Sequence, residues 1–151
     1  MRMRIIIFYI SVLSLSFCYS QNTKSNFYAF KNGEKLEYKL NYGFLNASYA
    51  SLTLKEELLD GQKVFRATSI GRTTGLARLF FKVEDIYETF FPMDNVKPIK
   101  SIRDIYEGGY EREAETEYDY ETNTAFFYDK LKNVNKEFKI HSEIQDIIST
   151  F

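Results

Sequence analysis

Hydrophobic and polar residues alternate along most of the chain, which is typical of β-strands with one buried face. The alternation is clearest after Gly33, where Glu37, Lys39 and Asn41 lie on the polar side of a predicted strand. The residues on its apolar side are Leu36, Tyr38, Leu40 and Tyr42. We therefore expect a half-buried strand over residues 36–42.

Turn signals divide the following chain into further strands of similar length. Asp60-Gly61 is a typical hairpin turn, and Gly108-Gly109 and Thr122-Asn123 mark two later turns. The strands predicted between these signals cover residues 47–58, 64–70, 82–91, 97–107, 110–121 and 124–129. The order predicts a mainly β fold, a curved antiparallel meander that forms an open or partial β-barrel.

A short segment near the middle of the chain interrupts the alternation. Leu76, Leu79 and Phe80 are spaced along one side of a helical turn that begins near Thr74. Breaks of this kind lie at the rim of a curved sheet, where binding loops are found.

The last residues carry a helical pattern instead. Ser142 and Gln145 form a capping box, in which each side chain bonds the other's backbone at a helix start. The apolar residues that recur at helical spacing around it are Ile140, Ile144, Ile147, Ile148 and Phe151. We expect a C-terminal helix packed on the sheet. Because the chain stops inside this stripe, we interpret residues 30–151 as a β-rich domain truncated at its C-terminus.

The first twenty residues have the build of a secretory signal. Arg2 and Arg4 precede a short apolar run over residues 5–17, and small residues, Cys18 and Ser20, stand at the third and first positions before a cut ahead of Gln21. We therefore expect export to the periplasm or to an outer-membrane-associated site. Residues 21–29 are expected to be a flexible lead-in to the domain. A lipid anchor on Cys18 is the alternative, although bulky Phe17 occupies a position where lipoprotein signals want a small residue.

Composition narrows the classes of function. Loss of Arg2 and Arg4 with the signal changes the formal charge from −1 to −3, so the mature chain lacks the basic stripe that nucleic acid needs. The single cysteine is also removed with the signal. The mature chain therefore has no disulfide, no thiolate nucleophile and no cysteine metal ligand. We expect no cofactor and no membrane-spanning segment in the mature chain.

Acidic residues occupy every second position of one predicted strand, namely Glu111, Glu113, Glu115, Glu117, Asp119 and Glu121. They share one face and could hold a cation or perform acid–base chemistry. The simpler interpretation is a solvated face, since Tyr118 and Tyr120 occupy the apolar side and Lys100 and Lys130 can supply counter-charges. His141 is the only histidine, and its place before the capping box favours a loop role. We predict no metal site and no catalytic residues.

Residues 72–82 are the best candidate for contact with a partner. Apolar side chains there are flanked by Arg72, Arg78 and Lys82, a combination that suits an amphiphile with an anionic head group or a membrane surface. The alternative is a helical turn that plugs the core. The ligand-binding residues that we predict are Tyr42, Phe44, Arg78, Leu79, Phe80, Phe81 and Phe90.

Several segments resemble a known family of exported bacterial proteins. The segments are GEKLEY at 33–38, YGFLNA at 42–47, FKVEDIYETF at 81–90, EGGY at 107–110 and QDIISTF at 145–151. Together they are similar to the family called domain of unknown function 3108, in members of the Bacteroidetes type. The resemblance implies a periplasmic or outer-membrane-associated β-rich domain, longer than this chain, with no assigned catalytic residues.

Our functional hypothesis is a non-catalytic binding or carrier module for a lipid or another apolar or amphiphilic ligand. The alternative is a structural or assembly factor of the cell envelope that acts through a protein partner. An apolar cavity of about 300 Å³ or more in the folded sheet would favour the first.

Overall fold

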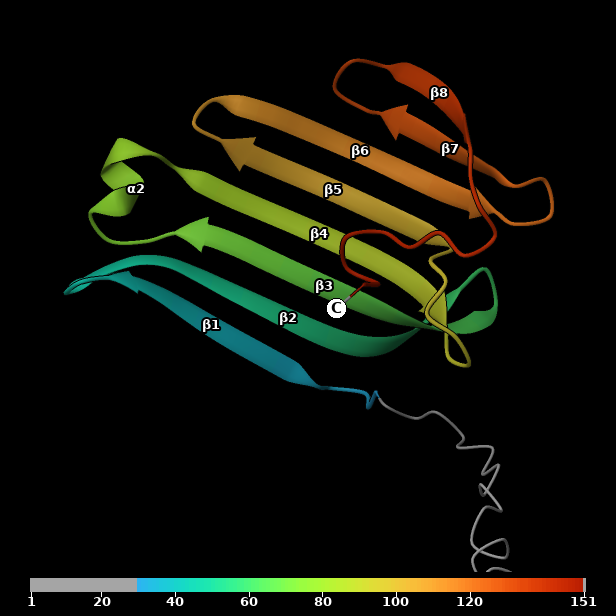
Figure 1. Cartoon of the computed structure of the whole chain (residues 1–151), viewed down its shortest axis with the longest axis horizontal. Helices are drawn as coiled ribbons and strands as arrows, with labels where there is room; N and C mark the ends of the chain where they lie inside the picture. The colour runs from blue at the N-terminus through green and yellow to red at the C-terminus, as the bar shows by residue number, and fades with distance from the viewer. Residues whose placement is uncertain (1–29, 151) are drawn as a thin grey trace, which may run out of the picture.

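A single antiparallel sheet forms the body of the protein in this computed structural model, which describes residues 30–150 (Figure 1). The predicted signal at 1–20 and the lead-in at 21–29 lie outside the described residues. The elements are β1 (Lys35–Tyr42), β2 (Leu45–Leu59), β3 (Gln62–Thr73), α2 (Ala77–Phe80), β4 (Val83–Pro92), β5 (Lys100–Glu107), β6 (Tyr110–Asp119), β7 (Thr124–Asp129) and β8 (Val134–Lys139).

The eight strands follow one another across the sheet in chain order, so every strand pairs with its sequence neighbours. This arrangement confirms the mainly β meander. The expected open or partial barrel is not closed: closure requires β1 to pair with β8, and among residues 30–150 β1 pairs with β2 alone and β8 with β7 alone. The sheet is open and has two edge strands.

The register assigns each side chain to one of two faces. Leu54, Ala67 and Thr89 lie opposite one another on β2, β3 and β4, and they define what we call the core face. Glu113, Glu115 and Glu117 lie on the other face, which we call the acidic face. The two faces therefore separate as the alternation predicts.

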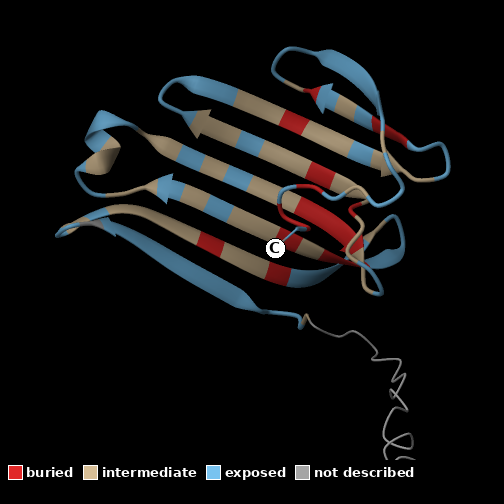
Figure 2. Cartoon of the chain, viewed as in Figure 1, coloured by how far each residue is buried: buried red, intermediate tan, exposed pale blue. Residues whose placement is uncertain are grey.

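The hydrophobic core occupies one half of the core face, where Figure 2 shows most of the buried residues. It consists of Leu54, Phe65, Ala67, Phe91 and Ile148. Phe91 links the cluster, with ring centroids 5.9 Å from Phe65 and 6.1 Å from Phe30. Because Ile148 is distant in sequence from the strands, the core depends on the segment that carries it.

That C-terminal segment is not the predicted helix. Residues 142–150 form a series of turns that cross the core face. No helix begins at the predicted capping box, and next to it the backbone N–H of Glu143 bonds the Nδ1 atom of His141 at 3.2 Å. The carboxylate of Asp146 accepts the backbone N–H groups of Ile148, at 3.1 Å, and Ser149, at 2.8 Å. Side-chain bonds of this kind compete with the helical backbone pattern and favour turns.

Asp146 also fixes the segment to the sheet. The hydroxyl of Thr89 donates to its Oδ2 atom at 2.6 Å, and both residues are buried. A buried carboxylate is costly unless its oxygens are bonded, and here the two oxygens accept three bonds. The bond therefore holds Ile148 over the core.

The helical turn predicted near Thr74 is confirmed as α2, a single turn of four residues. It does not plug the core, because Leu79 and Phe80 point away from the sheet and are among the most exposed apolar side chains. The alternative in which this turn fills the core is wrong.

Ile148 and its neighbour Ile147 give a matched test of the covering segment. We expect Ile148→Ala to lower the free energy of unfolding by about 2–5 kcal/mol, as for other large-to-small core changes. Ile147→Ala should have little effect, because Ile147 is 52% exposed and Ile148 only 8%. Urea unfolding of both variants checks this, and equal effects would contradict the described core.

Candidate ligand-binding site

An apolar cavity of about 380 Å³ opens on the core face between β1, β2 and the C-terminal segment. Its apolar lining comes from Phe30, Leu36, Leu52, Leu54, Ala67, Phe91, Val96 and Ile148. Leu52 and Leu54 point the same way because they are two positions apart on β2. The cavity lies beside the core, and Leu54, Ala67, Phe91 and Ile148 belong to both.

Four polar residues also line this cavity. Glu34, Lys35, Thr53 and Ser149 complete its lining. Lys35 is paired with Glu37 at 2.6 Å on the exposed edge of the sheet. The hydroxyl of Ser149 accepts the backbone N–H of Asp146 at 2.9 Å. Such a site can hold the apolar body of a ligand and leave a polar end at the rim.

The second half of the core face is open and carries ionisable groups. Asp85 on β4 and Glu107 on β5 lie diagonally across the strand pair, on the same face. Burial and the neighbouring Glu107 carboxylate raise the pKa of Asp85 above its usual range. The backbone N–H of Tyr106 donates to Asp85 at 3.3 Å, which opposes the rise in pKa.

The acidic face carries the row of carboxylates, and the predicted counter-charges are confirmed. Lys100 pairs with Glu115, and Lys130 pairs with Glu113 at 3.0 Å. The turn at Thr122-Asn123 would place Tyr118 opposite Phe127 in a simple hairpin, whereas in the structure Tyr118 lies opposite Ala125, a shift of two residues. A shift of two keeps every side chain on its predicted face.

Among residues 30–150 no group of three histidine, cysteine or acidic side chains is arranged to hold a metal ion. His141 is exposed in the loop before the C-terminal turns, where its ring caps the N–H of Glu143. Within the same range no helix has the length and apolar character needed to cross a membrane.

Comparison with known proteins gives one match. Residues 37–151 match the family model described as protein of unknown function (DUF3108). The chain belongs to the DUF3108 family. No curated protein matches the chain, and no solved structure matches it. The family assigns neither an activity nor site residues to the DUF3108 domain, so its geometry carries the functional argument.

The predicted site residues of this DUF3108 domain lie away from the cavity. Phe44 is in the β1–β2 turn, Arg78, Leu79 and Phe80 form most of α2, and Phe81 follows directly. These five residues come together at the end of the sheet opposite the cavity (Figure 1). Their clustering at a rim agrees with the prediction, and none of them lines the cavity.

The other two predicted residues are in strands. Phe90 on β4 is buried on the acidic face, with the Arg66 guanidinium 5.6 Å from its ring centroid. Tyr42 ends β1, and its side chain lies outside what the structure describes. The cavity residues were missed because Phe30, Leu52 and Ile148 come together only through long-range packing.

Asp85→Asn tests the electrostatics of the open half. The fold holds the Asp85 proton more tightly than the unfolded chain does, so ionisation costs stability at pH values above the folded pKa. We expect the variant to raise the urea midpoint at pH 7, and the gain to vanish as the pH falls below about 3.9, the unfolded pKa. The asparagine oxygen can still accept the Tyr106 bond.

Asp104→Asn is the control for this measurement, because Asp104 is exposed on the acidic face of the adjacent strand β5. It should leave the midpoint nearly unchanged across the same pH range. A lower midpoint for Asp85→Asn at pH 7 would show that the ionised carboxylate stabilises the fold.

Proposed function

We propose that this DUF3108 domain is a binding or carrier module for an apolar or amphiphilic ligand. The observation that carries the proposal is the cavity of about 380 Å³ on the core face. It exceeds the volume of about 300 Å³ at which small-molecule sites begin. Its walls are mostly apolar, so transfer of an apolar ligand from water is favourable.

The position of the cavity supports reversible uptake. Leu36 is on the edge strand β1, and one flank of the cavity is therefore open to solvent. Ile148 belongs to the turns of the C-terminal segment rather than to a strand. A ligand can enter between this segment and β1 without separating any paired strands.

The chemistry of the lining favours binding without catalysis. The one serine in it, Ser149, has its hydroxyl bonded to the backbone of Asp146. Glu34 and Lys35 lie at the rim, where they can meet the polar head of an amphiphile. The proposed role is to shield an apolar ligand from water.

The proposed compartment follows from the N-terminal sequence. A charged start with Arg2 and Arg4, an apolar run and small residues before a cut after Ser20 indicate export. In the periplasm, or at the outer membrane, apolar molecules need a carrier because they are poorly soluble in water.

Leu36→Asp and Leu40→Asp form a matched pair for testing the cavity. Both leucines are on the core face of β1 and are 52% and 56% exposed, and only Leu36 lines the cavity. We expect Leu36→Asp to weaken binding of N-phenyl-1-naphthylamine by about tenfold, because the carboxylate loses water when the probe binds. Leu40→Asp should bind the probe as the unmodified protein does.

The readout is the rise in probe fluorescence on titration of purified, folded protein. Competition by a long-chain fatty acid then tests whether an amphiphile uses the same site. Absence of saturable probe binding by the unmodified protein would overturn the proposal, and so would equal loss in both variants.

A second candidate function is that of a structural or assembly factor of the envelope. The edge of β1 favours it, because Leu36, Tyr38 and Leu40 are exposed along a strand that has a partner on one side only in the described part of the chain. An incoming strand can extend such a sheet. Affinity purification from envelope fractions distinguishes the assembly factor from the ligand carrier. A stoichiometric protein partner that is lost in Leu40→Asp supports the assembly factor. Loss of probe binding in Leu36→Asp, with no such partner, supports the ligand carrier.

A further inference from the structure

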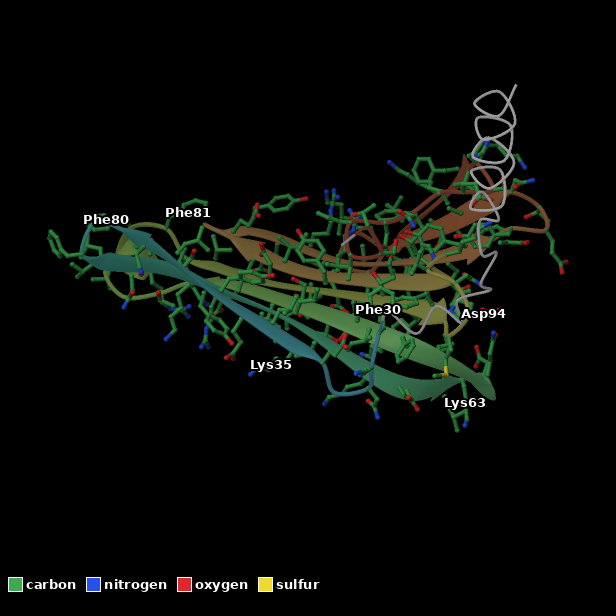
Figure 3. All side chains as sticks on the ribbon, turned by 60° about the horizontal axis from the view of Figure 1, so that its bottom comes forward. Phe30, Lys35, Lys63, Phe80, Phe81 and Asp94 are labelled. Atoms are coloured by element: carbon green, nitrogen blue, oxygen red, sulfur yellow. The ribbon has the colours of Figure 1, made fainter. Side chains whose placement is uncertain are left out.

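Five large apolar side chains are exposed together at the end of the sheet farthest from the cavity. We call this group the apolar tip, and it consists of Phe44, Leu76, Leu79, Phe80 and Phe81. Phe44 is 96% exposed, Phe80 88% and Leu79 79%. In Figure 3 Phe80 points outward beyond the ends of the strands. Exposed clusters of this size mark an interaction surface.

The connections that carry the tip are fixed to one another. The backbone N–H of Thr74 donates to Ala47 at 3.0 Å, and its hydroxyl donates to Asn46 at 3.3 Å. These bonds hold the β3–α2 connection against the start of β2, next to Phe44. The Phe81 ring lies against Gly108 so closely that a Cβ there would fall 2.2 Å from the ring. The tip is therefore a single structural unit.

Two backbone N–H groups of the tip are hydrogen-bonded within its helical turn. Phe81 N–H donates to Ala77 at 3.0 Å, and Leu79 N–H donates to Leu76 at 3.1 Å. At the start of β4 the N–H of Val83 donates to the Thr73 hydroxyl at 2.9 Å. Backbone groups that enter lipid must be paired internally, so these bonds lower the cost of placing the tip at a lipid surface.

The segment that carries most of the tip, residues 72–82, has only positive charges. Residues 72–82 contain Arg72, Arg78 and Lys82 and no carboxylate, in a chain of net charge −1. Arg78 and Lys82 share a single acidic partner, Glu84. The Lys82 ammonium also lies 4.5 Å from the centroid of the Tyr106 ring. Both cations are therefore held toward the strands that adjoin the tip, through Glu84 on β4 and Tyr106 on β5.

We propose that the apolar tip inserts into the surface of an anionic lipid bilayer. Phe44, Leu79 and Phe80 enter the boundary between head groups and acyl chains, while Arg78 and Lys82 contact lipid phosphates. This arrangement of apolar side chains flanked by cations is the one that binds anionic interfaces. A narrow, protruding tip fits a fluid surface, whereas a protein partner needs a broader area of contact. The inference does not depend on the cavity and goes beyond the ligand-binding proposal.

The absence of tryptophan from the sequence allows a direct test. In Phe80→Trp the indole is the only one in the protein, and Phe126→Trp places the same reporter on the acidic face. The vesicles contain equimolar phosphatidylglycerol and phosphatidylcholine. We expect a saturable blue shift of the emission for Phe80→Trp and no shift for Phe126→Trp. The shift should shrink with phosphatidylcholine alone or at high salt.

A second variant pair measures binding without a reporter. We expect the double variant Leu79→Ser with Phe80→Ser to co-sediment with the same vesicles at least tenfold more weakly than the unmodified protein. Leu58→Ser with Phe126→Ser, which removes two exposed apolar side chains elsewhere, should bind as the unmodified protein does. Unchanged urea midpoints would show that both double variants are folded.

Three outcomes would overturn the proposal: no blue shift for Phe80→Trp, equal binding by the two double variants, or equal affinity for neutral and anionic vesicles. A protein that binds the tip while the vesicles do not would assign this surface to a protein partner instead. None of these results bears on probe binding in the cavity, so the two proposals can fail separately.

Discussion

The bond from the Thr89 hydroxyl to the Asp146 carboxylate is the contact on which the arrangement depends. An open antiparallel sheet must bury one face, and no second sheet or long helix is present among residues 30–150 to cover it. The cover is instead a short run of turns, held down by one buried carboxylate. This cover buries the core at Phe65 and Phe91. Because it is narrow, the adjacent part of the core face stays uncovered and forms the cavity.

The two ends of the sheet consequently differ in character. One end carries the core, the cavity and the C-terminal segment, and the other carries α2 and the apolar tip. Between them Asp85 and Glu107 occupy the uncovered half of the core face. The two sites proposed above lie at opposite ends and share no residues.

Most of the fold could be predicted from the sequence because strand alternation and turn residues are local signals. Asp60 and Asn123 have positive φ angles in their turns, at 50° and 51°, as the predicted hairpins require. β8 was missed because its sequence, VNKEFK, is mostly polar and all six residues are exposed. The strand at 36–42 was predicted as half-buried, yet Leu36 and Leu40 are mostly exposed, since no element among residues 30–150 covers this edge.

The C-terminal segment and the cavity could not be predicted in the same way. An acidic residue at position 146 is typical of the first turn of a helix. In the structure its carboxylate instead accepts a bond from Thr89, which lies 57 positions earlier in the chain and could not be identified from the local sequence. The cavity likewise combines Phe30, Leu52 and Ile148, whose proximity no local pattern encodes. Five of the seven predicted site residues lie at one rim because they belong to the two connections there, which is a local property.

The chain-order arrangement of the strands has a consequence for how the protein folds. Each new strand joins the one just before it through a short connection, so the loop entropy lost at each step is small. The sheet can therefore grow progressively from whichever hairpin forms first, as repeat proteins do. Docking of the final turns spans a far longer loop, and we expect it to be the last and slowest event.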